Sequence, residues 1–138
     1  MKEVLVTVKT VQHDGERSDT MELTAEGTLA EKGGAYLIKY QDAFLAGPDQ
    51  PVMTTVRVTA AGAVTVTRTG PYQNRFTLEA GKRCQCLYTT PYGVMTMGFY
   101  GELVENNLTE SGGTLRLVYA VDVNHKALNR NEMLLTVK

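Results

Sequence analysis

The sequence predicts an all-β fold, a single antiparallel up-and-down barrel of about eight to ten strands. Three observations lead to this prediction. Apolar and polar residues alternate with a period of two in one segment after another, as on a strand with one buried face. Valine, threonine and tyrosine dominate these segments. Turns rich in glycine and proline separate them, and no window of similar length repeats with the period of a helix.

The strands are placed one by one from the alternation and the turns between them. In chain order, the apolar faces are Val4/Val6/Val8, Met21/Leu23/Ala25, Tyr36/Ile38/Tyr40, Val52/Val56/Val58, Val64/Val66, Leu115/Leu117/Tyr119/Val121/Val123 and Met133/Leu135/Val137. Turn residues, including those at 47–51, mark the ends of these segments. Alternation and turns together predict strands near 2–11, 20–31, 35–43, 52–60, 63–69, 74–79, 83–89, 93–105, 113–124 and 131–137. The four prolines all lie in or beside the breaks, where a missing N–H costs no ladder hydrogen bond.

Short connections between successive strands indicate a meander, which must either split into two sheets or close. Closure removes the exposed edges that promote aggregation, so we favour a barrel over a Greek-key sandwich. Gly98 and Gly101 interrupt the longest predicted strand and are expected to mark the bend at a barrel corner. A chain of 138 residues with 43% hydrophobic content fits one domain, residues 1–138.

Charge and composition exclude several classes of function. The 14 basic and 15 acidic residues are scattered, and the pI is about 6.1, so nucleic acid and membrane are not expected as partners. The first ten residues alternate and lack the apolar core of a signal peptide, and no run reaches the length of a membrane span. With only two cysteines, we expect a cytoplasmic protein, either a monomer or a homodimer.

The sequence does not predict an enzyme. It contains no nucleophile elbow, no phosphate loop and no visible Cys–His or Ser–His arrangement. Cys84 and Cys86 would share one strand face with alpha carbons about 6.6 Å apart, and a copper(I) site with nearby methionines is the alternative to simple core packing. Core packing is favoured, because cysteine and methionine are ordinary core residues. We therefore expect no metal site and no cofactor.

The stretch YTTPYG at 88–93 predicts a type I turn, with proline second and glycine fourth in Thr90–Gly93. If that turn sets the register, Tyr88 lies opposite Met95, Cys86 opposite Met97 and Cys84 opposite Phe99. The functional interpretation places Tyr88 and Tyr92 at the rim of a ligand pocket. The alternative is a tight hairpin with aromatic packing.

Arg68 is the most informative charged residue. A three-residue hairpin loop with Gly62 in the left-handed conformation would put Arg68 on the apolar face of Val64 and Val66. Its guanidinium would then lie inside the barrel or at its mouth and bind a ligand carboxylate or phosphate. The alternative is an ion pair with a protein carboxylate, for which Glu26 and Glu102 are candidates, or a side chain that reaches out to solvent.

Several pieces in this order resemble the YwiB-like family of small bacterial proteins: AEGTL (25–29), YLIKY (36–40), MTTVRV (53–58), VTVTRTG (64–70), GKR (81–83), YTTPYG (88–93) and GGTLRLVY (112–119). The resemblance implies a calycin-like barrel of eight to ten strands, similar in shape to lipocalins and fatty-acid-binding proteins, in a family whose biochemical role is undefined. The Gly-X-Trp signature of lipocalins is absent, since the chain has no tryptophan.

Two functions remain open from the sequence. The first is a non-catalytic module that binds a small apolar or amphipathic molecule inside the barrel, with Arg68, Tyr88, Tyr92 and Tyr119 as candidate ligand-binding residues. The second is a solid barrel that acts through its outer surface or as a dimer. The small residues expected to face inward favour a cavity: Ala25, Gly27, Thr54, Thr96 and Gly98. Large inward residues such as Tyr36, Phe99 and Tyr119 favour a filled interior.

Overall fold

A computed structural model describes residues 2–42, 52–71 and 73–138, which form ten strands. The strands are β1 (Lys2–Asp14), β2 (Arg17–Lys32), β3 (Ala35–Asp42), β4 (Val52–Val58), β5 (Val64–Thr69), β6 (Asn74–Leu78), β7 (Arg83–Thr90), β8 (Gly93–Thr109), β9 (Gly112–Val123) and β10 (Lys126–Val137). The predicted turn at 47–51 and the last residue of the predicted strand 35–43 lie outside the described residues. Within the described ranges, no helix is long and apolar enough to cross a membrane.

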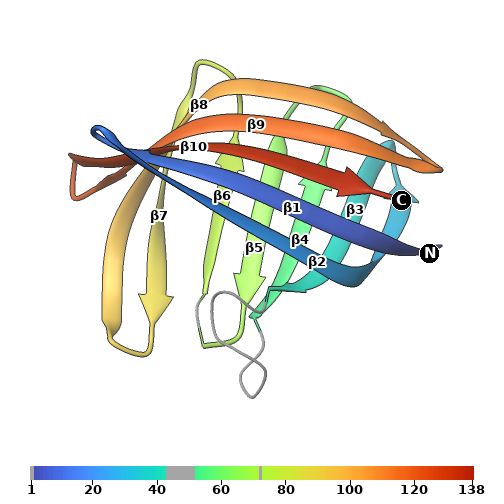
Figure 1. The fold of residues 1–138 in the computed structure, drawn as a ribbon, viewed down its shortest axis with the longest axis horizontal. Helices are drawn as coiled ribbons and strands as arrows, with labels where there is room; N and C mark the ends of the chain where they lie inside the picture. The colour runs from blue at the N-terminus through green and yellow to red at the C-terminus, as the bar shows by residue number, and fades with distance from the viewer. Residues whose placement is uncertain (1, 43–51, 72) are drawn as a thin grey trace.

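All ten strands belong to one antiparallel sheet, in the order β6-β5-β4-β3-β2-β1-β10-β9-β8-β7. The pairing of β1 with β10 brings the two ends of the chain together, and the sheet curls so that its edge strands β6 and β7 become neighbours (Figure 1). Outside the named ladders of the described chain, one isolated bridge joins Gln73, next to β6, to Thr89 of β7, and another joins Ala80, in the β6–β7 connection, to Gly101 of β8. We call this junction the seam. The predicted up-and-down barrel is confirmed, and it is nearly closed.

The β7–β8 hairpin has the register predicted from its turn. Cys84 pairs with Phe99, Cys86 with Met97 and Tyr88 with Met95. The hydroxyl of Thr90 fixes the turn, because it accepts a hydrogen bond from the Tyr92 N–H at 3.1 Å and donates one to the Gly93 carbonyl at 3.0 Å. The turn therefore sets which side chains of both strands face the barrel interior.

The predicted bend in β8 occurs at Gly101, where the register against β9 shifts. A Cβ at Gly101 would collide with the backbone carbonyl of Glu79, so the close approach of the β6–β7 connection requires glycine here. The Gly101 N–H donates to the Lys82 carbonyl at 3.1 Å, and the Gly101 carbonyl accepts from the Gly81 N–H at 2.8 Å. These bonds close one end of the seam.

Gly98 and Thr96 do not face inward, and that expectation was wrong. The register places them opposite Gln85 and Leu87, on the outer face. A side chain at Gly98 would collide with the Arg83 guanidinium, which crosses above this glycine to bind the Asp122 carboxylate at 2.8 and 3.1 Å. This hydrogen bonding holds the pKa of Asp122 below its usual value.

The barrel interior is divided into two parts along the strands. Towards one end it is filled by fully buried aliphatic side chains, including Val6, Ile38, Val58, Val64, Leu78, Leu115 and Leu135. The opposite ends of the same strands contribute Val8, Thr10 and Gln12 of β1, Tyr40 of β3, Arg68 of β5, Asn74 of β6 and Val121 of β9 to a pocket. The interior is therefore neither fully open nor solid.

Candidate ligand-binding site

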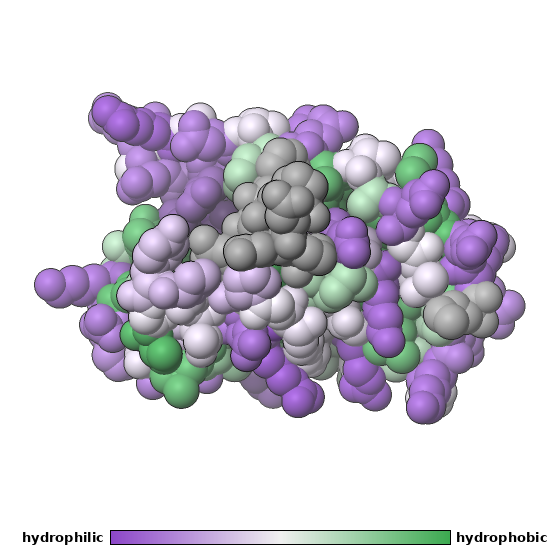
Figure 2. All heavy atoms as spheres, turned by 90° about the horizontal axis from the view of Figure 1, so that it is seen from below, coloured by the Kyte–Doolittle hydropathy of each residue, from purple (hydrophilic) through white to green (hydrophobic). Residues whose placement is uncertain are grey.

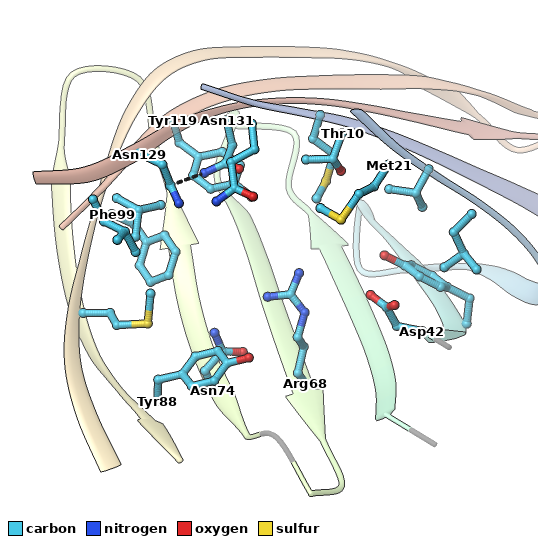
Figure 3. A pocket seen from close by; sticks show the side chains of 18 residues that line it. Thr10, Met21, Asp42, Arg68, Asn74, Tyr88, Phe99, Tyr119, Asn129 and Asn131 are labelled. Carbon is cyan, nitrogen blue, oxygen red and sulfur yellow. Dashed lines mark hydrogen bonds between the residues drawn. The ribbon is translucent and has the colours of Figure 1, made fainter. Parts of the chain in front are cut away.

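The pocket has a volume of about 280 Å³ and lies between the walls of the barrel (Figure 3). Much of its lining is apolar, with Val8, Leu23, Met97, Phe99, Val121 and Met133 among the contributing residues. Phe99 and Tyr119 contribute aromatic rings to the lining, and Phe76 of β6 stacks on Phe99 of β8 from behind the lining, with ring centres 3.9 Å apart. Tyr119 packs against both rings at 6.1 Å. This stack joins β6 to β8 across the seam.

Polar side chains also face the interior, and four of them form one continuous row across β3 to β6. Other polar residues lie elsewhere on the lining, among them Thr10, Gln12, Asn129 and Asn131. Tyr40 pairs with Thr54, Thr54 with Arg68, and Arg68 with Asn74 on the successive strands β3 to β6. We call these four residues the polar row. Each occupies an inward position, because alternation along its strand continues to a buried apolar residue, as from Asn74 to Phe76 and from Arg68 to Val66.

The polar row contains buried hydrogen-bonding atoms that the protein does not satisfy. In the described part of the chain, Arg68 Nε, Asn74 Nδ2 and Asn74 Oδ1 are buried side-chain atoms without a hydrogen-bond partner. Thr54 differs from them, because its hydroxyl lies close enough to Tyr40 for a hydrogen bond that lowers the pKa of that phenol against the effect of burial. Asn74 is only 6% exposed. Leaving such an atom unpaired costs about 1–3 kcal/mol, and folded proteins seldom keep several together. The unsatisfied atoms of Arg68 and Asn74 lie together on one wall of the pocket.

The Arg68 side chain lies across the Phe76 ring, with the guanidinium carbon 5.7 Å from the ring centre. The ion pairs found among the described residues do not include Arg68. Of the two carboxylates considered from sequence, Glu102 instead binds Arg130 at 2.6 Å, and Glu26 lies on the exposed face of β2. Arg68 is the only basic residue and Asp42 the only acidic residue among the described residues that line the pocket.

The buried tyrosines add neutral polar groups to the pocket. Burial raises the pKa of Tyr40 to about 12, although the nearby Arg68 charge opposes the shift. Burial also raises the pKa of Tyr119, again against the effect of Arg68. Both phenols are therefore protonated at neutral pH and do not neutralise the guanidinium charge.

The structure brings three of the four predicted site residues together. Arg68, Tyr88 and Tyr119 line the pocket, whereas Tyr92 lies at the tip of the β7–β8 hairpin, 91% exposed and outside the lining. Sequence reasoning missed Asn74. Its position two residues before Phe76 in a predicted strand was the available signal, since that spacing puts both side chains on one face.

Cys84 and Cys86 are free thiols on the inward face of β7, packed against the core. Burial raises the pKa of the Cys86 thiol, with a smaller contribution from Cys84, while a hydrogen bond from the backbone of Arg75 opposes the shift. Among the described residues, no group of three or more histidine, cysteine, aspartate or glutamate side chains is placed to hold a metal ion.

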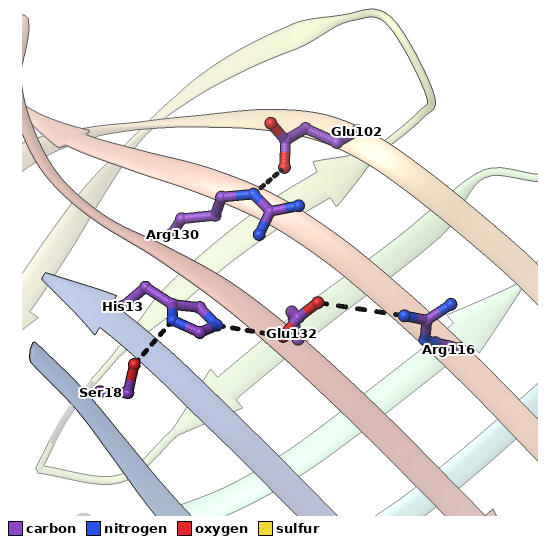
Figure 4. A network of polar contacts seen from close by, with 6 residues as sticks. All are labelled: His13, Ser18, Glu102, Arg116, Arg130 and Glu132. Carbon is purple, nitrogen blue, oxygen red and sulfur yellow. Dashed lines mark hydrogen bonds and ion pairs between the residues drawn. The ribbon is translucent and has the colours of Figure 1, made fainter. Parts of the chain in front are cut away.

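A second polar cluster lies on the outer face of the barrel (Figure 4). His13 bonds Ser18 through Nδ1 at 2.9 Å and Glu132 through Nε2 at 3.0 Å, and Arg116 lies 3.9 Å from the Glu132 carboxylate. Hydrogen bonding to His13 lowers the pKa of Glu132. Strand pairing explains the cluster, because His13 lies directly opposite Ser18 in the β1–β2 ladder. None of these four residues lines the interior pocket.

Comparisons with known proteins agree with this fold. The family model of a domain of unknown function, DUF1934, matches residues 6–135. The curated proteins give no match. The crystal structure of YwiB protein from Bacillus subtilis matches with a TM-score of 0.87 and 20% identity, over 99% of this chain and 90% of that chain. That similarity shows the shared barrel fold and confirms the YwiB-like resemblance. The chain belongs to the DUF1934 family.

Proposed function

We propose that this protein is a non-catalytic module that binds a small, partly apolar ligand inside the barrel. The observation that carries the proposal is the polar row, with its unsatisfied buried atoms on the wall of an otherwise largely apolar pocket. Ligand pockets commonly combine an apolar lining with a few placed polar groups, over about 300–1,000 Å³. The volume of about 280 Å³ is at the lower limit of that range and favours a small ligand.

The chemistry of the pocket supports binding rather than catalysis. A general acid or base works best with a pKa near the operating pH, and the Tyr40 phenol, with a pKa of about 12, is far from that condition. Arg68 is permanently charged and serves as an anchor rather than as a proton-transfer group. The proposal includes a cytoplasmic location, which the two free thiols support.

The solid-barrel alternative has less support. The interior keeps a pocket, and the face of the molecule in Figure 2 carries polar side chains with smaller apolar groups between them. The turn end of the β7–β8 hairpin exposes four large apolar side chains, but they lie on one hairpin and form a small patch rather than an extended interface: Leu87, Tyr92, Val94 and Met95.

Native mass spectrometry of gently purified protein tests the proposal. A discrete added mass, absent from the denatured sample, is the expected result, either directly or after incubation with a pooled metabolite and lipid extract. Val121→Phe places a ring in the pocket and should abolish the added mass, because Val121 is buried on the lining. Leu87→Phe, on the outer face, is the control and should retain it. A bare protein in every sample would refute ligand binding.

A further inference from the structure

We propose that the ligand is a small monocarboxylic acid that carries a hydroxyl or amino group beside its carboxylate and an apolar body. The inference rests on the proposed function and specifies the ligand of the same pocket. It follows from three properties of the described lining, namely its charge, its unsatisfied donors and acceptors, and its volume.

The charged groups of the lining favour a ligand with one carboxylate and no second anionic group. One guanidinium, that of Arg68, faces the pocket, and the buried phenols of Tyr40 and Tyr119 remain neutral at physiological pH. A single carboxylate can pair with this one guanidinium and matches its planar geometry. Because Asp42 already balances the formal charge of the described lining, a second anionic group on the ligand would find no basic partner there. A phosphate dianion would leave excess negative charge in the same pocket as Asp42, which disfavours it.

The hydrogen-bonding capacity of the wall narrows the chemistry further. Arg68 Nε offers one donor, and Asn74 offers an amide donor and an amide acceptor, all buried and unsatisfied by the protein. Arg68 and Asn74 face each other on adjacent strands, so one ligand group can contact both. A carboxylate accepts hydrogen bonds from the two donors, but it has no hydrogen to donate to Asn74 Oδ1. A hydroxyl or amino group on the neighbouring carbon supplies that missing donor.

This match does not depend on how the Asn74 amide is oriented. The oxygen and nitrogen of the amide lack partners equally, so a rotation of the group by half a turn exchanges their positions and keeps one donor and one acceptor. Figure 3 shows the Arg68 and Asn74 side chains on the pocket wall formed by neighbouring strands, with the Tyr88 ring beside Asn74.

The remaining lining fits an apolar body of limited size. Met97, Phe99 and Val121 lie on β8 and β9, strands that close the barrel opposite the polar row. The volume of about 280 Å³ is at the lower limit of the range found for ligand pockets. This space suits a compact acid with one ring or a short branched chain, and it is too small for a long-chain fatty acid.

Isothermal titration calorimetry with three probes of one skeleton tests the inference: 3-phenyllactate, 3-phenylpropionate and 3-phenylpropanamide. The expected order of affinity is hydroxy acid, then plain acid, then neutral amide. Because hydrogen bonds to charged groups contribute more than neutral ones, the acid should bind at least about tenfold more tightly than the amide.

Matched variants assign each preference to its residue. Arg68→Met should remove the preference for acid over amide, and Asn74→Leu should remove the preference for the hydroxy acid over the plain acid. Arg75→Met is the control for the arginine, since Arg75 lies on the exposed face of β6 next to Asn74, and it should leave all three affinities unchanged.

The possible failures are distinguishable. If Val121→Phe blocks all three probes but wild-type protein binds acid and amide equally, the pocket binds ligands and the acid assignment is wrong. If no probe binds, or if the ligand released from native protein lacks a carboxylate, the assignment is also wrong. The proposed function then depends on the native mass measurement alone.

Discussion

Replacing Asn74 by leucine should stabilise the protein. Asn74 is 6% exposed, and neither atom of its amide has a hydrogen-bond partner. Leucine has a similar shape and removes both unsatisfied groups. If each contributes about 1 kcal/mol, the low end of the usual penalty, the free energy of unfolding rises by about 2 kcal/mol. For a domain of this size, that gain corresponds to an increase in Tm of roughly 6–10 °C. Urea unfolding followed by circular dichroism measures the change.

Asn131→Leu is a matched comparison at a second buried asparagine. Asn131 is 7% exposed and lines the same pocket, but its amide nitrogen donates to Asn129 Oδ1 at 2.8 Å. Leucine there breaks that bond and should lower stability by about 1–2 kcal/mol. The two substitutions should therefore have opposite signs. If Asn74→Leu destabilises the protein as much as Asn131→Leu, the Asn74 amide is satisfied within the folded protein, and the argument for a ligand at the polar row fails.

Three further predictions concern the pocket and its borders. Folded protein keeps the Tyr40 proton to a pKa of about 12, while the unfolded chain releases it near 10, so the stability due to Tyr40 is complete below pH 10 and lost as pH rises through 12. Wild-type stability should fall by about 2–3 kcal/mol more than that of Tyr40→Phe over this range in urea titrations at fixed pH. Gly101→Ala should cost about 1–3 kcal/mol in the same assay, because the added methyl group meets the Glu79 carbonyl, and an unchanged midpoint would contradict the close approach of the two backbones. Tyr92→Ala should leave both the stability and the acid affinity measured by calorimetry unchanged, because Tyr92 is exposed outside the pocket. Tyr88→Ala should weaken binding, because Tyr88 lines the pocket. Equal effects of the two variants would contradict binding of the acid in this pocket.

Local chemistry was enough to predict most of the fold. The turn at Pro91 fixed the β7–β8 register, and the loop at Gly62 fixed the β4–β5 register that turns Arg68 inward. Both predictions succeeded because a tight turn determines which residues pair, and the period of two then determines every facing side chain. The closed meander followed from the short connections, and the bend at Gly101 from a glycine inside a long strand.

Other features depend on contacts that a single sequence does not display. The strand predicted from residue 131 begins at Lys126, since pairing with β9 continues through a turn formed by Asn124 and His125. Both turn residues have positive φ, 53° and 65°, without a glycine to signal it. Likewise β1 reaches Asp14 although its last residues do not alternate clearly, because the β1–β2 ladder extends to the hairpin end. Pairing overrides weak local patterns at such ends.

The candidate site was predictable only in part, for a geometric reason. Arg68 and Asn74 are inward residues in their own strands, but they become neighbours only when β5 pairs with β6. The size of the pocket depends on how the curled sheet spaces its walls, and no sum of side-chain volumes gives that spacing. Tyr92 shows the opposite, since it is near Tyr88 in the sequence but does not share its site. Its proximity to Tyr88 in sequence suggested a shared rim, but Tyr88 lies on the strand and Tyr92 in the turn beyond it.

The division of the barrel interior reconciles a stable fold with a costly site. Buried aliphatic side chains fill one end of the barrel interior and provide most of the apolar burial. Packing at that end therefore holds the ten strands together. The other part can then keep unsatisfied groups at Arg68 and Asn74, at an energetic cost that packing elsewhere offsets. Such a cost is expected where a protein binds a ligand, because atoms satisfied within the protein would have no free capacity for a partner. The proposed ligand accounts for this cost, because its donors and acceptors can pair with the unsatisfied atoms of Arg68 and Asn74.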